Sequence, residues 1–128
     1  MTYSLSLTVA LSVLSGTGMA VAEAQRHCTT AFAVFPSGNQ QDAVFDLTIA
    51  DAGSAAKVSV AGSGAWSAER RPEGNGAETI SFDTGAADET LTIGAGGELL
   101  WQIDYKDSHA NSDRVIAFAG MCDPWRGQ

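Results

Sequence analysis

The side chains best spaced for metal chemistry lie in the polar stretch Lys106–Arg114. Oxygen and nitrogen donors alternate there at every second position, as oxygen ligands do in a calcium loop. These donors are Asp107, His109, Asn111 and Asp113. Such a loop also needs a glycine and a bidentate glutamate, and this sequence has Ser112 and Phe118 at those positions. We therefore predict no bound metal and no cofactor, with Asp107, Asn111 and Asp113 as weak candidate ligands only.

Catalytic patterns are equally weak. The two histidines, His27 and His109, have no cysteine or second histidine at a metal-ligand spacing. Ser63 lies between two glycines, but without the spacing of a nucleophile elbow. The carboxylates Asp88 and Glu89 are adjacent, so on a strand they would point to opposite faces and make poor acid–base partners. The residues therefore predict a non-catalytic domain.

The first 24 residues have the pattern of an export signal. An apolar run from Leu5 to Val13 is followed by small residues, and the small-x-small site that ends at Ala24 predicts cleavage after that residue. No lysine or arginine precedes the run, which departs from the usual signal. The run is shorter than the roughly 20 apolar residues that cross a bilayer. We expect a periplasmic or secreted protein whose single domain spans residues 25–128.

The two cysteines, Cys28 and Cys122, support export. An even number of cysteines in an exported protein predicts disulfide bonding, and two cysteines allow one intrachain pairing. A redox role would need a closely spaced pair, which the sequence lacks. We predict a structural disulfide that encloses nearly all of the mature chain.

The remaining sequence alternates apolar and polar residues between turns rich in Gly, Asp, Asn and Ser, which predicts short strands. Fourteen glycines disfavour helix throughout. The predicted strands are Thr29–Phe35, Ala43–Ala50, Ala56–Ala61, Ala65–Arg70, Glu78–Asp83, Glu89–Ile93, Glu98–Tyr105 and Arg114–Met121. Eight such strands predict an all-β antiparallel meander, either a closed or nearly closed barrel or a β-sandwich.

The cysteines favour the barrel. In an up-and-down barrel with an even strand count, the start of the first strand lies beside the end of the last, where Cys28 and Cys122 are predicted. Strict alternation places one set of residues of the first strand on a common face, namely Cys28, Thr30, Phe32 and Val34. It likewise places one set of residues of the last strand on a common face, namely Ile116, Phe118, Gly120 and Cys122. A disulfide at this seam would protect open strand edges. A sandwich with Greek-key connections could also bring the two ends together.

The charge and the aromatic residues limit the functions that we consider. A formal net charge of −8 disfavours nucleic acid and anionic membranes as partners and permits a cationic one. Trp66, Trp101 and Tyr105 lie at inward-facing positions, where they would fill a barrel or line a ligand cavity. Trp125 follows the last cysteine and either folds back or anchors a partner.

One short stretch resembles part of a known family. Ser63-Gly64-Ala65-Trp66 is similar to a stretch near the inhibitory loop of the periplasmic inhibitors of C-type lysozyme, which share the layout of signal, small acidic barrel and disulfide. The resemblance covers these four residues, and the family's Lys-Gly-Asp-Glu-like continuation is missing. It therefore assigns no membership.

We expect an exported binding domain that takes a cationic protein in the manner of an inhibitor. Its predicted partner-binding residues are Ser63, Gly64, Trp66 and Trp125. One alternative is a lipocalin-like barrel for a small apolar ligand, which a roomy apolar cavity would favour. The other alternative is a structural component of envelope assembly.

Overall fold

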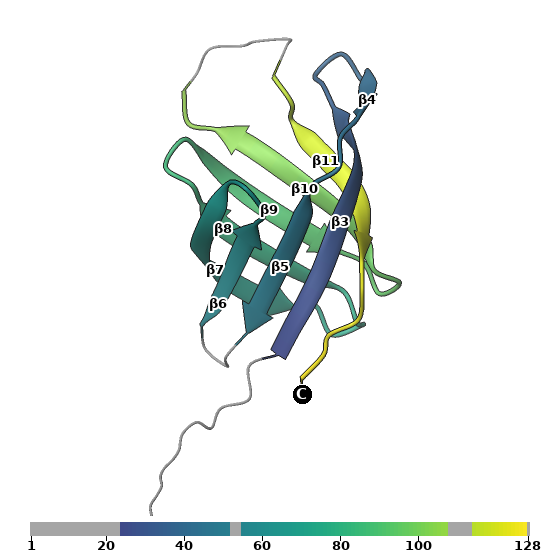
Figure 1. The fold of residues 1–128 in the computed structure, drawn as a ribbon, viewed down its shortest axis with the longest axis vertical. Coiled ribbons are helices and arrows are strands. Elements are labelled where there is room, and N and C mark those ends of the chain that lie inside the picture. The colour runs from purple at the N-terminus through teal and green to yellow at the C-terminus, as the bar shows by residue number, and fades with distance from the viewer. Residues whose placement is uncertain (1–23, 52–54, 108–113, 128) are drawn as a thin grey trace, which may run out of the picture.

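Antiparallel strands form the whole fold in the computed structural model, which describes residues 24–51, 55–107 and 114–127 (Figure 1). No helix in these ranges is long and apolar enough to cross a membrane. The predicted signal falls almost entirely in residues 1–23, outside the described ranges. The strands are β3 (Ala24–Val34), β4 (Gln40–Asp42), β5 (Asp46–Asp51), β6 (Ala56–Val60), β7 (Gly64–Pro72), β8 (Glu78–Asp83), β9 (Ala87–Ile93), β10 (Glu98–Tyr105) and β11 (Ala117–Cys122).

The sheet is a closed barrel. From β5 to β11 each strand pairs with the next along the chain, β5 pairs with β3, and β3 pairs with β11. These eight strands close the ring. The short β4 pairs with the C-terminal part of β3, beyond the part that pairs with β5. Closure decides between the two predicted architectures in favour of the barrel, because a sandwich would leave two separate sheets.

The disulfide lies at the seam between the first and last barrel strands. Cys28 and Cys122 are directly opposite each other in the register of β3 and β11, with their Cα atoms 3.9 Å apart. Both are buried, and the bond joins positions 94 residues apart. The predicted pairing and its place in the fold are therefore confirmed.

A bulge in β3 changes the predicted alternation. Thr30 and Phe32 lie opposite consecutive residues of β11, so Ala31 is an extra residue in this ladder. Beyond the bulge the buried side chain is Ala33 instead of Phe32, and the prediction that Phe32 and Val34 share the face of Cys28 is wrong. On β11, Gly120 faces the bulge, where any Cβ atom would collide with the Thr29 carbonyl oxygen.

The strand predicted at Ala43–Ala50 is interrupted, which corrects its start to Asp46. The Thr30 hydroxyl lies at the break, donating a hydrogen bond to the Ala43 carbonyl and accepting one from the Phe45 amide, both 2.8 Å long. A side chain thereby satisfies two backbone groups that a continuous ladder would pair, so the strand can bend there. The bend releases Phe45 toward one end of the barrel.

The last predicted strand also begins late, at Ala117 instead of Arg114. Ile116, which alternation placed inward, is 39% exposed. Between the two barrel ends the core is apolar and continuous. Its fully buried aliphatic side chains are Leu47, Ile49, Val58, Ile80, Leu91 and Ile93.

Candidate functional site

The two ends of the barrel differ in chemistry. One end, which we call the closed end, is where β3, β8 and β10 begin and where β7 finishes. The other end, which we call the mouth, is where β6, β8 and β10 finish and where β7 and β9 begin. Polar and charged side chains fill the closed end, whereas the mouth is lined mainly by rings.

A buried ion cluster fills the closed end. Glu78 accepts hydrogen bonds from Arg26, at 2.6 Å across the barrel interior, and from Arg70, at 2.5 Å. Arg70 also donates to Asp51, at 2.5 Å. Partial burial would by itself lower the pKa of Arg70, but its hydrogen bonds to Glu78 and Asp51 raise it above the ordinary value. Both carboxylate oxygens of Glu78 accept hydrogen bonds within the cluster, which acts as a structural plug of the barrel interior.

Trp125 covers this plug. Its indole N–H donates to Glu78 at 2.7 Å, and the Arg70 guanidinium lies 4.4 Å from the centre of its ring. Gln25 and Arg126 exchange two backbone hydrogen bonds of 2.8 Å, which hold the C-terminal segment against the start of β3 (Figure 1). The structure therefore shows Trp125 folded back, one of the two arrangements considered from the sequence.

A cavity of about 290 Å³ opens at the mouth. We call it the mouth cavity. Its lining is Phe45, Val60, Ser63, Trp66, Thr84, Glu89, Trp101, Ile103 and Phe118. Its volume is at the lower limit of small-molecule pockets, which span roughly 300–1,000 Å³ and are mainly apolar with a few polar groups.

Aromatic rings form two walls of this cavity. On one side, Trp101 packs against Phe118 with ring centres 4.7 Å apart, and Phe45 meets Phe118 edge-on at 5.2 Å. On the other side, Trp66 lines the cavity and stacks on Phe82 at 5.7 Å. The interruption before β5 is what lets Phe45 reach the first wall. Such rigid rings bury a planar ligand at little entropic cost.

Glu89 is the charged side chain of the mouth cavity. It lies opposite Phe82 on β8 and Ile103 on β10, both of which point inward. Its Oε1 atom accepts a hydrogen bond of 2.7 Å from the indole N–H of Trp101. The Glu89 carboxylate thus lies among apolar side chains, and one of its oxygens orients the Trp101 ring.

Tyr105 and Arg114 lie beside the mouth. Partial burial raises the pKa of Tyr105 and the negative charges of Glu89 and Asp107 act in the same direction, although the Arg114 charge opposes them. The Arg114 guanidinium stacks 4.5 Å from the centre of the Tyr105 ring. It also donates two hydrogen bonds of 2.7 Å to Asp107. The positive charge of Arg114, at the rim of the mouth, is therefore already neutralised by Asp107.

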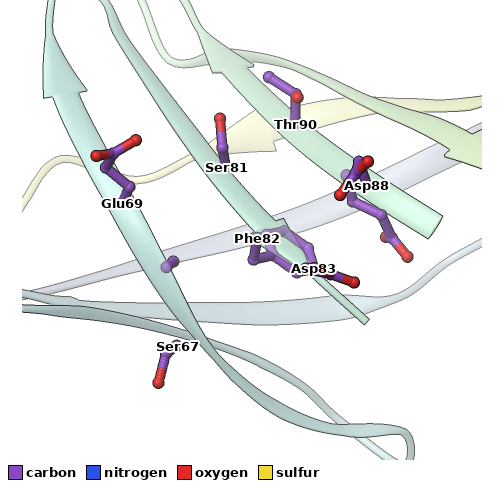
Figure 2. A pocket seen from close by; sticks show the side chains of 9 residues that line it. Ser67, Glu69, Ser81, Phe82, Asp83, Asp88 and Thr90 are labelled. Carbon is purple, nitrogen blue, oxygen red and sulfur yellow. The ribbon is translucent and has the colours of Figure 1, made fainter. Parts of the chain in front are cut away.

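A second hollow lies on the outer face of β7, β8 and β9, and we call it the acidic groove. It has a volume of about 550 Å³, and its outward side chains are Ser67, Glu69, Ser81, Asp83, Asp88 and Thr90 (Figure 2). Asp83 and Asp88 are direct neighbours in the strand register. A hydrogen bond from Lys106 lowers the pKa of Asp83, with further help from the Gly85 amide. The acidic groove is open, polar and negatively charged.

The structure separates the predicted partner-binding residues. Ser63 and Trp66 both line the mouth cavity, and Gly64 adjoins them with a φ of +143° against the Trp66 ring. Trp125 lies at the closed end. The four residues therefore do not form one surface, and the three at the turn between β6 and β7 belong to the mouth.

The candidate calcium loop lies mostly outside the described residues, which include neither Asn111 nor Asp113. Asp107 is described, and both of its carboxylate oxygens accept hydrogen bonds from Arg114. Within the described ranges, no group of three or more His, Cys, Asp or Glu side chains is placed to hold a metal ion.

Sequence reasoning missed Glu89 as a site residue. A signal was present, because Glu89 occupies an inward position between Ala87 and Leu91, both buried. A carboxylate at an inward position needs a hydrogen-bonding or oppositely charged partner, which can be a ligand. Glu89 was considered only as an acid–base partner of Asp88, so its inward position was overlooked.

Comparisons with known proteins do not assign the chain. No protein-family model matches it, and no curated protein is similar to it in sequence.

Proposed function

We propose that this protein binds a small, largely apolar molecule in the mouth cavity and does not transform it. The observation that carries the proposal is the open, ring-lined mouth cavity, which lies at the opposite end of the barrel interior from the buried ion cluster. Barrels of eight strands commonly hold one small ligand in this way. The disulfide supports a place of action outside the cytoplasm, in the periplasm or beyond it.

Indole resonances offer a direct test. We expect titration with 4-phenyl-1-butanol, a neutral compound of suitable size, to shift the indole N–H signals of Trp66 and Trp101 in a ¹H–¹⁵N spectrum. The signal of Trp125 should stay, because that ring lies at the closed end. For so small a ligand we expect a Kd on the order of 10–1,000 μM.

A matched pair of variants locates the binding. Ile103→Phe adds volume at an inward position of β10 that lines the mouth cavity, so it should weaken binding at least tenfold. Leu100→Phe adds the same kind of bulk on the outer face of that strand, where Leu100 is 39% exposed, and should change nothing. Unmoved indole signals, or equal effects of the two variants, would contradict ligand binding at the mouth.

The acidic groove supports a second candidate, which is docking of a cationic protein. Its Glu69, Asp83 and Asp88 carboxylates are all exposed on one face, and Asp83 forms an ion pair with Lys106. Complementary charge accelerates association and makes affinity depend on salt. This candidate predicts binding through the outside of the barrel, away from the mouth.

A charge-reversal pair tests this second candidate, with a cationic C-type lysozyme as the probe. If the acidic groove is the docking surface, binding should weaken as ionic strength rises, and Glu69→Lys should weaken it about tenfold. Asp42→Lys makes the same charge change on β4, outside the acidic groove, and should have little effect. Isothermal titration calorimetry measures both variants, and equal effects would show a non-specific charge response.

A further inference from the structure

The Glu89 carboxylate in the mouth cavity has an unused hydrogen-bonding oxygen. Oε1 accepts from Trp101, and within the described ranges no other donor and no Lys, Arg or His contacts this side chain. A carboxylate that is partly removed from water without a cationic partner is costly. Among the described residues, the mouth cavity therefore has a negative charge and no positive charge to balance it.

The rim residues that the structure describes do not supply that charge. Lys106 donates to Asp83 at 2.7 Å, and Arg114 is held by Asp107. Asp88, next to Glu89 on β9, adds negative charge outside the cavity. The field at the mouth is thus negative, and both described rim cations face other carboxylates.

The rings around Glu89 suit a cation as well. The faces of Trp and Phe rings attract ammonium groups, and desolvation strengthens this attraction. Trp101 is oriented by its hydrogen bond to Glu89, and Trp66 lines the opposite wall. An ammonium group beside Glu89 would meet a carboxylate and aromatic faces together, while its apolar body would pack against Phe118 and Phe45.

We propose that the mouth cavity selects ligands that join a positively charged nitrogen to a small apolar body, with Glu89 as the counter-charge. This inference rests on the proposed ligand-binding function and specifies its ligand class. The volume of about 290 Å³ limits the ligand to a body smaller than a typical drug molecule. Amines and quaternary ammonium compounds with one ring or a short chain meet these conditions.

Three compounds of one size separate charge from shape. They are 4-phenylbutylamine, 4-phenyl-1-butanol and 4-phenylbutyrate, which are cationic, neutral and anionic at pH 7. We expect the amine to bind about 10- to 100-fold more tightly than the alcohol, because hydrogen bonds to charged groups are stronger than neutral ones. The carboxylate should bind most weakly. The indole shifts of Trp66 and Trp101 report all three.

Glu89→Gln removes the charge while keeping an oxygen that can accept from Trp101. We expect this variant to lose the preference for the amine over the alcohol, a ratio that is measured on the variant itself. An unchanged indole signal of Trp125, which lies at the closed end, shows that the variant is folded. Asp88→Asn removes the adjacent charge on the outer face of the same strand and should retain at least most of the preference.

The outcomes distinguish the inference from the function on which it rests. If the amine and the alcohol bind equally, or if Asp88→Asn removes the preference as fully as Glu89→Gln does, the role of Glu89 is overturned while ligand binding stands. If none of the three compounds moves the two mouth indoles, both proposals fail. Tight amine binding that depends on Glu89 alone supports both.

Discussion

Glu78→Gln is expected to lower the free energy of unfolding by about 3–5 kcal/mol, as removing one partner from a buried ion cluster commonly does. The Glu78 side chain is 3% exposed and holds two guanidinium groups and the Trp125 indole. Glutamine is nearly the same size but carries no charge. Arg26, whose side chain is 7% exposed, would then remain buried without its carboxylate partner.

Urea denaturation measures this effect, through a lower midpoint at an unchanged slope. Asp83→Asn provides the control, because it removes the charge from an ion pair whose two side chains are 56% and 43% exposed. Surface pairs of this kind contribute little, so the control should leave the midpoint nearly unchanged. Equal shifts for the two variants would show that the closed end is not a buried plug.

Removing the disulfide by the double change Cys28→Ala and Cys122→Ala is expected to cost about 4–5 kcal/mol. The bond spans 94 residues, and in the chain-entropy model a loop of that length gains this much by restricting the unfolded chain. The seam hydrogen bonds between β3 and β11 remain available in the variant, so the folded barrel itself should be preserved.

Chemical reduction supplies the control for this second prediction. The reduced natural chain and the double variant should unfold at closely similar urea concentrations, both far below the oxidised protein. Circular dichroism before denaturation should give the same strand signal for all three. A loss of less than about 1 kcal/mol would mean that native contacts alone determine the seam.

The alternation of the sequence predicted the antiparallel meander, and the two cysteines favoured a barrel over a sandwich. Every barrel strand was located, and the positions of Cys28 and Cys122 correctly predicted the closing pair. Alternation failed where a local contact replaced the ladder. The Thr30 hydroxyl interrupts the strand before Asp46, and the extra residue Ala31 reverses the facing of the residues after it.

The early start of β3 was missed for a different reason. Arg26 occupies an inward position, but a charged residue next to the predicted cleavage site reads as a polar terminus. Its burial depends on Glu78, which lies 52 residues away on the far side of the barrel. No pattern within one strand indicates such a partner, so the ion cluster required the three-dimensional fold.

The mouth was predictable in part. The inward positions of Trp66 and Trp101 were correct, but the same positions suit a filled core and a lined cavity equally well. The difference depends on how the rings tilt, for example on the 39° angle between Trp101 and Phe118. The sequence likewise could not decide whether Trp125 folds back or anchors a partner, because the side chains that it contacts come from β7 and β8.

The pairing of Gln25 with Arg126 has a consequence for rearranging the chain. Both ends of the folded domain meet at the closed end, on the far side from the mouth cavity. A linker of a few residues could join them, and new ends could be opened at a tight turn such as Gly94–Gly97, which would give a circular permutant. By the same geometry, a carrier or surface fused beside Gln25 or Arg126 would leave the mouth facing outward.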